Sequence, residues 1–116
     1  MNSNIHEITI PVMVHKQQTM RYGLDFDAQV IDHLIPINVR QWIESGIMKE
    51  FQTTHEEDKY MEYLCERKMV FEVEVEYTPA GQAKGATCHT VCPNFVKAWV
   101  EKEAMKQFNL KEVVNG

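Results

Sequence analysis

Apolar and polar residues alternate along three segments of the chain, and this period of two predicts strands. In residues 8–14, isoleucine and valine occupy every second position, and a second alternating segment follows at residues 20–26. The polar residues 16–19 between them predict a hairpin loop. Pro11 has no amide hydrogen for a ladder bond, so we expect the first strand at a sheet edge, or Pro11 at a bulge. The chain is therefore predicted to begin with a β-hairpin.

The apolar spacing then changes to the period of a helix, and the pattern predicts three helices before the next strand. The first covers residues 26–35, because a residue that precedes a proline, here Pro36, disfavours the helical conformation. The second runs over residues 38–51, from a capping box that begins at Asn38. The third runs over residues 54–68, with its own capping box, acidic residues in the first turn and basic residues in the last.

A second hairpin and a last helix are predicted in the C-terminal half. Residues 71–77 alternate between large apolar side chains and glutamates, and residues 78–85 contain the proline and the glycines of a loop. Residues 86–91 are expected to pair back as the second strand. Pro93 is expected at the first helical position with Cys92 at the cap, because proline has no amide to leave unpaired there.

The predicted elements follow in the order strand, strand, three helices, strand, strand, helix. This order predicts an α+β fold in which a four-stranded, mostly antiparallel sheet of two hairpins carries helices packed on one face. We expect residues 1–116 to form a single domain, because no linker long enough to divide the chain is present. The two hairpins give a loose internal symmetry, and no further repeat is evident in the pattern.

Charge and composition argue against several classes of protein. The 116 residues include 12 Lys and Arg against 17 Asp and Glu, a net charge of −5, so nucleic-acid binding is not expected. No apolar stretch reaches the roughly 18 residues of a spanning helix, so no membrane partner is expected. Three cysteines do not fit a disulfide-stapled secreted domain, and the N-terminal residues do not resemble a signal peptide. We therefore expect a cytoplasmic protein.

Three glutamates follow one another on the polar side of the predicted strand at residues 71–77, about 6.5–7 Å apart. Neighbours on one strand face point in parallel, whereas a catalytic carboxylate pair or a metal site needs convergence. The row is therefore interpreted as a solvated face or, together with the acidic first turn of the preceding helix, as a docking surface. The expected binding residues are Glu72, Glu74, Glu76, Glu56, Glu57 and Asp58.

The sequence Cys88-His89-Thr90-Val91-Cys92 is the segment most typical of a chemical site. Its two thiols and one imidazole are candidate metal ligands, although structural zinc sites usually have four ligands in two pairs. A thiol at a helix N-terminus, as predicted for Cys92, has a lowered pKa, and with His89 nearby it is a candidate for catalysis. The simpler interpretation is that Cys88 and Cys92 are small buried residues. No metal and no cofactor is predicted.

These observations favour a small intracellular protein–protein interaction module, of the inhibitor or adaptor type. It would present an acidic surface to a basic partner such as a nucleic-acid-handling enzyme. No credible catalytic set is visible. Two alternatives stay open: a cysteine-dependent enzyme or redox protein that uses Cys92, and a domain that binds a small ligand between sheet and helices. A homodimer through the predicted edge strand at residues 8–14 is also left open, although Pro11 disfavours it.

Overall fold

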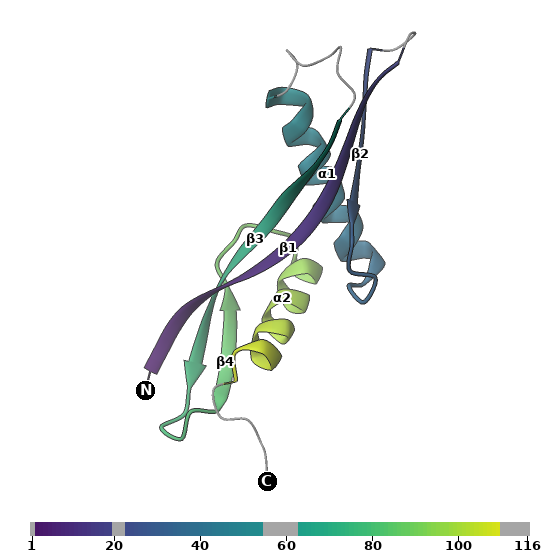
Figure 1. The fold of residues 1–116 in the computed structure, drawn as a ribbon. Coiled ribbons are helices and arrows are strands. Elements are labelled where there is room, and N and C mark those ends of the chain that lie inside the picture. The colour runs from purple at the N-terminus through teal and green to yellow at the C-terminus, as the bar shows by residue number, and fades with distance from the viewer. Residues whose placement is uncertain (1, 20–22, 55–62, 110–116) are drawn as a thin grey trace. The chain divides into compact units, whose positions relative to one another are not determined.

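Figure 1 shows the computed structural model of the protein, which describes residues 2–19, 23–54 and 63–109. Its elements are β1 (Asn2–Thr19), β2 (Gly23–Val30), α1 (Ile37–Thr54), β3 (Tyr63–Tyr77), β4 (Ala83–Cys88) and α2 (Asn94–Gln107). The strands form one four-stranded sheet in the order β2-β1-β3-β4, and both hairpins are antiparallel. The predicted α+β class with two hairpins is confirmed, but the described residues contain two helices where four were predicted.

The chain divides into two compact units. Unit 1 comprises Met1–Thr9 and Val70–Gly116, and unit 2 comprises Ile10–Met69. Unit 1 therefore contains β4, α2 and the longer part of β3, while unit 2 contains β2, α1 and the longer part of β1. Each unit has one helix that follows an edge strand of the sheet.

In unit 2, β1 and β2 pair from Val12 opposite Val30 to Thr19 opposite Gly23. The prediction of a loop at residues 16–19 is wrong, because these residues belong to the ladder. Backbone hydrogen bonds join the two strands whatever their side chains are, so a polar stretch can continue a strand. The hairpin itself is confirmed, with a longer ladder than the alternation indicated.

β1 lies between β2 and β3, so the expectation that Pro11 marks an edge strand is wrong. The ladder with β2 ends at Val12 opposite Val30, where the Val30 amide points away from β1 and donates to Glu44 Oε2 at 2.8 Å. The amide of Val12 therefore also points away from β2. Because successive amides of a strand point to opposite sides, the nitrogen of Pro11 points toward the β2 side, where β2 has already ended. A proline fits there because no ladder bond is lost. An edge-to-edge homodimer through residues 8–14 does not fit an inner strand.

The helix predicted for residues 26–35 is wrong. β2 continues to Val30, and a turn follows in which the Leu34 amide donates to Asp32 Oδ1 at 2.9 Å. The apolar residues of this segment fit a strand as well as a helix, and pairing with β1 decides for the strand. The next predicted helix is confirmed as α1. It begins one residue earlier than predicted, so Asn38 lies inside its first turn and is not the cap.

The third predicted helix, residues 54–68, is also wrong. Residues 63–68 belong to β3, and residues 55–62 lie outside the described residues. Along residues 65–70 the exposure alternates from one residue to the next, as a strand requires. Capping residues are local signals, whereas the pairing of β3 with β1 is a tertiary interaction, and here the tertiary interaction outweighs the local preference.

In unit 1, β3 and β4 form the second predicted hairpin. Their register runs from Val73 opposite Cys88 to Tyr77 opposite Ala83. The connecting turn needs Gly81, whose φ of 89° lies in the left-handed region that favours glycine. β4 begins and ends three residues earlier than predicted, because the ladder follows the register set by this turn and not the apolar pattern.

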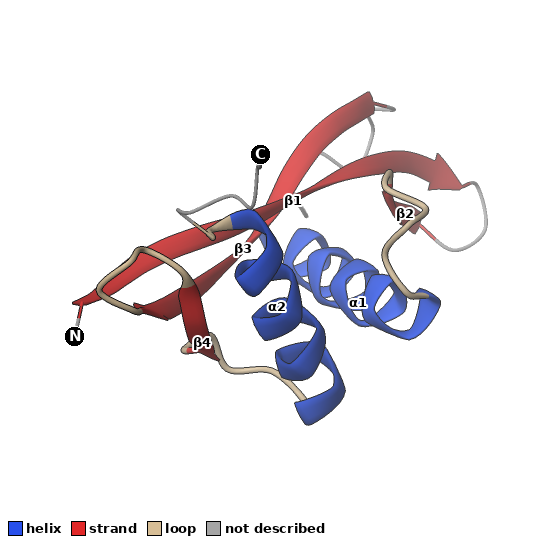
Figure 2. Ribbon diagram, turned by 90° about the horizontal axis from the view of Figure 1, so that it is seen from below, coloured by secondary structure: helices blue, strands red, loops and turns tan. Residues whose placement is uncertain are grey.

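One face of the unit 1 strands is buried under α2 (Figure 2). The buried residues of the two layers are Ile8, Phe71, Val73, Val75, Tyr77, Cys88, Val96, Val100 and Ala104. The alternation predicted for residues 71–77 is therefore confirmed, with its apolar side in the core. α2 begins at Asn94 with Pro93 at the cap, so the prediction that Cys92 is the cap residue is wrong. The Pro93 carbonyl accepts the first helical hydrogen bonds.

The two helices and the prolines before them have similar sequences. Residues 36–51 and 93–108 align without a gap and share seven identical residues, including both tryptophans of the chain. The identical pairs are Pro36 and Pro93, Val39 and Val96, Trp42 and Trp99, Glu44 and Glu101, Met48 and Met105, Lys49 and Lys106, and Phe51 and Phe108. The internal symmetry therefore extends beyond the two hairpins that the pattern indicated.

The repeated glutamates make the same hydrogen bond in both units. Glu44 Oε2 accepts from the amide of Val30, the last residue of β2, at 2.8 Å. Glu101 Oε2 accepts from the amide of Cys88, the last residue of β4, also at 2.8 Å. Since β2 and β4 are the edge strands, an amide that points outward has no neighbouring strand to bond. In each unit, the helix therefore supplies a carboxylate that satisfies the last amide of the edge strand.

Replacing either glutamate by alanine should lower the free energy of unfolding by about 1–3 kcal/mol, because a partly buried amide loses its charged acceptor. We expect Glu44→Ala and Glu101→Ala to act to a similar extent in urea denaturation. Glu103→Ala is the matched control, since Glu103 pairs with Lys106 one helical turn away at 3.7 Å, and an ion pair of this kind contributes at most about 0.5 kcal/mol. A loss in the control as large as that in Glu101→Ala would contradict the role assigned to the repeated glutamates.

Candidate functional site

The predicted row of glutamates lies on the face of unit 1 opposite α2. Glu72, Glu74 and Glu76 alternate along β3 with buried residues, so their side chains project from the other face. Glu72 is exposed, and Glu74 and Glu76 are half-exposed. The structure therefore places these three residues together, as the alternation indicated. The other three predicted binding residues lie outside the described part of the chain: Glu56, Glu57 and Asp58.

β1 adds a fourth glutamate to this surface. Ile8 is buried, and Nε2 of His6 lies 2.9 Å from the hydroxyl oxygen of buried Tyr77. The His6 ring also stacks on Phe108, with ring centroids 4.2 Å apart. Glu7 lies between these two core-facing residues and therefore projects to the opposite side. We call the four glutamates the acidic face: Glu7, Glu72, Glu74 and Glu76. The alternation in the sequence predicts the face from which Glu7 projects. Its position near the three glutamates of β3 follows only from the strand order, in which β1 lies beside β3.

A hydrogen-bond network orders one end of the acidic face. His89 follows the last residue of β4, and its Nε2 lies 3.0 Å from Oε1 of Glu74. The His89 amide donates to the Glu72 carbonyl at 2.8 Å. The Glu72 amide in turn donates to Oγ1 of Thr90 at 2.8 Å. His89 is therefore a hydrogen-bond partner of a surface carboxylate.

Cys92 is not the activated thiol that its predicted position implied. It precedes the cap residue of α2, and its Sγ donates to the Thr90 carbonyl at 3.4 Å. Burial, with a smaller contribution from neighbouring Cys88, raises the pKa of Cys92 to about 11. At neutral pH nearly all of this thiol is protonated, whereas a nucleophile needs the thiolate. The geometry therefore argues against the catalytic role considered for Cys92 and His89.

The three candidate metal ligands do not converge. Cys88 is buried in unit 1, whereas His89 bonds to Glu74 on the acidic face. The sulfurs of Cys88 and Cys92 both donate to the carbonyl of Thr90. Within residues 2–19, 23–54 and 63–109, no group of three His, Cys, Asp or Glu side chains is placed to hold a metal ion. His89 is separated from the two thiols because it projects to the opposite face of the sheet, whereas both thiols approach the same backbone carbonyl.

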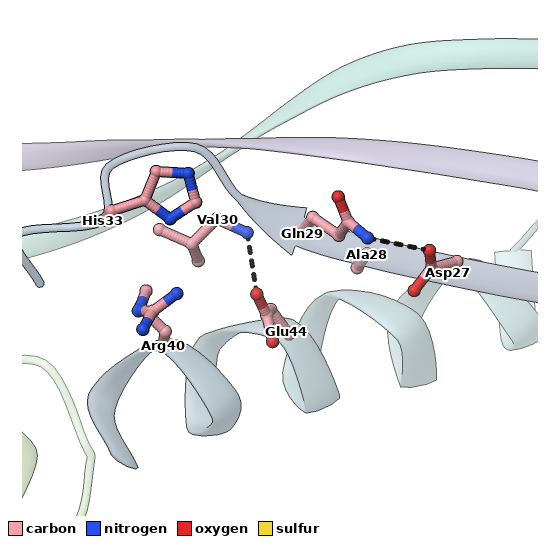
Figure 3. Close-up of a pocket in the computed structure, with 7 residues that line it drawn as sticks. All are labelled: Asp27, Ala28, Gln29, Val30, His33, Arg40 and Glu44. Carbon is pink, nitrogen blue, oxygen red and sulfur yellow. Dashed lines mark hydrogen bonds between the residues drawn. The ribbon is translucent and has the colours of Figure 1, made fainter. Parts of the chain in front are cut away.

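Unit 2 contains an open, polar cavity of about 360 Å³ beside β2 and α1 (Figure 3). Its lining residues are Asp27, Ala28, Gln29, Val30, His33, Arg40 and Glu44. Glu44 is held by the Val30 amide, and Arg40 Nε donates to the Ile35 carbonyl at 2.9 Å. The volume is that of a ligand pocket, but ligand pockets are mostly apolar, whereas this lining offers charges of both signs. The alternative that the protein binds a small ligand therefore stays a prediction, and this cavity is the candidate binding site.

No family model, curated protein or solved structure matches the chain. Among the described residues, no helix is long and apolar enough to cross a membrane. The function is therefore inferred from the residues and contacts described above.

The raised pKa predicts slow alkylation of Cys92. In a Cys65→Ser variant, peptide mapping after iodoacetamide treatment should give a Cys92 rate that still rises about tenfold per pH unit between pH 8 and 10, because the rate follows the thiolate fraction. In urea, the same thiol should react with an ordinary pKa of about 8.5. A folded-state rate that levels off below about pH 8 would instead reveal an activated thiol.

Proposed function

We propose that the protein is an interaction module that presents the acidic face to a basic surface of a partner protein. The observation that carries the proposal is the arrangement of four glutamates on one sheet face of unit 1, opposite the face that α2 covers. His89 contacts one of the four carboxylates, with its Nε2 3.0 Å from Oε1 of Glu74.

The geometry of the carboxylates supports recognition more than chemistry. Glu72, Glu74 and Glu76 project in parallel from one strand, about 6.5–7 Å apart, so none of them converges with another on a common atom. General acid–base catalysis and cation binding both need such convergence. A flat row of like charges can instead meet a row of Lys and Arg side chains on a partner.

Such a surface acts mainly on the rate and selectivity of association. Opposite charges steer two proteins together and disfavour partners of the same sign, while exposed ion pairs contribute little affinity each. Basic surfaces are typical of proteins that bind phosphate backbones, so a nucleic-acid-handling enzyme is the partner class that fits best. The protein would act as an inhibitor or adaptor of this enzyme. The expected interaction weakens with salt, because exposed charges are screened.

The test compares two variants of equal net charge. Glu72→Gln/Glu74→Gln/Glu76→Gln removes three charges from the acidic face, and the control Asp32→Asn/Glu50→Gln/Glu103→Gln removes three charges from the turn after β2 and from the two helices. The wild type and the control, immobilised and incubated with lysate of the cells that encode the protein, should retain the same basic protein. The acidic-face variant should bind the purified partner at least about tenfold more weakly, a loss of about 1.4 kcal/mol.

Equal binding by the two variants would contradict the proposal, because it would show that the position of the charges is irrelevant. Binding that does not change between about 0.1 M and about 1 M salt would contradict it as well, since the Debye length falls from about 10 Å to about 3 Å over this range.

A further inference from the structure

Each unit exposes one large aliphatic residue at the same position of the repeat. Leu34 in unit 2 is 92% exposed and Val91 in unit 1 is 94% exposed. Both stand two residues before the repeated proline. Repeated apolar residues in the core are explained by packing, but a side chain surrounded by water contributes no burial to the fold. A single exposed aliphatic residue is ordinary; its presence at the matching position of both units indicates a contact with another molecule.

Each unit also has a cation in the first turns of the helix that follows the exposed aliphatic residue. Arg40 and Lys97 occupy the same position of the repeat, near the start of α1 and α2. Arg40 Nε donates to the carbonyl of Ile35, the residue after the exposed leucine. The backbone amides of Arg40 and Lys97 both donate to the carbonyl of the repeated proline, Pro36 or Pro93, at 3.0 Å, so the two cations have the same place in their units. Each unit thus has a docking element that combines an aliphatic residue with a cation: Leu34 with Arg40, and Val91 with Lys97.

The acidic face offers the complementary groups. Ile5 on β1 and Val70 on β3 are 57% and 40% exposed. Ile5 is one residue from His6, and Val70 is one residue from Phe71; both of these neighbours face the core, so Ile5 and Val70 project from the same side as the glutamates. Each has a glutamate two residues along the same strand face, Glu7 for Ile5 and Glu72 for Val70. An aliphatic side chain beside a carboxylate matches an aliphatic side chain beside a cation, both in polarity and in charge.

We propose that the acidic face of one molecule binds a docking element of a second copy of this chain. The proposal rests on the proposed function, because it uses the same face, and it names one protein that carries the basic surface. The contact joins two different surfaces, so it is heterologous and does not close by two-fold symmetry. The contacting groups are few compared with the about 1,200–2,000 Å² that stable interfaces bury, so association is expected to be weak and to depend on concentration and salt.

Sedimentation velocity from micromolar to millimolar protein measures this association directly. The weight-average mass of the wild type should rise with concentration at about 0.1 M salt and return to that of the monomer at about 1 M salt. Leu34→Ser/Val91→Ser removes both exposed aliphatic residues without touching the core, and should raise the dissociation constant at least about tenfold. Leu34→Met/Val91→Ile is the matched control and should associate like the wild type. For the cation, Lys97→Gln should weaken association more than Lys102→Gln.

Mixing two variants tests which surfaces meet. Leu34→Ser/Val91→Ser keeps the acidic face, and Glu72→Gln/Glu74→Gln/Glu76→Gln keeps the docking elements. Each variant should be monomeric alone, and the mixture should form a heterodimer. A monomeric wild type at all concentrations, or a mixture that stays monomeric, would overturn the self-docking. Acidic-face-dependent capture of a foreign basic protein by a monomeric wild type would leave the proposed function intact and overturn only this inference.

Discussion

The burial of one side of β3 against α2 determines the arrangement of unit 1. Four side chains of β3 are at most 2% exposed: Phe71, Val73, Val75 and Tyr77. Burying one such side chain contributes about 1.5–3 kcal/mol to the free energy of unfolding, relative to leaving it exposed. Because strand residues alternate between faces, this burial fixes the direction of the intervening glutamates without any interaction of their own. The acidic face is thus a consequence of core packing.

Both units combine an edge strand with a helix that follows it, and the repeated residues separate structural roles from surface roles. The repeated glutamate of each helix bonds the last amide of the edge strand, and the repeated valine of each helix, Val39 or Val96, is buried in the core. These similarities follow from the fold. The exposed residues Leu34 and Val91 have no such explanation, since neither is buried in its unit.

Periodicity predicted the parts of the fold that one-sided burial controls: the strand at residues 71–77, the hairpins and both observed helices. It failed where a tertiary interaction decided. Residues 63–68 carry the basic end of a helix pattern, yet pair as part of β3. The roles of Glu44, Glu101 and Glu7 depend on strand ends and strand order, which a single sequence does not contain. The repeat of residues 36–51 at 93–108 was present in the sequence, and a direct comparison of the two helical segments would have revealed it.

The central claim is that residue 71 belongs to the core and residue 72 to the solvated acidic face. The most direct test is the free energy of unfolding of Phe71→Ala and Glu72→Ala, measured by urea denaturation under the same conditions. Phe71→Ala should destabilise the protein by about 3–5 kcal/mol, because it leaves a cavity, and Glu72→Ala should change stability by no more than about 0.5 kcal/mol. Equal losses, or a larger loss at Glu72, would mean that the glutamates face the interior and that the acidic face does not exist.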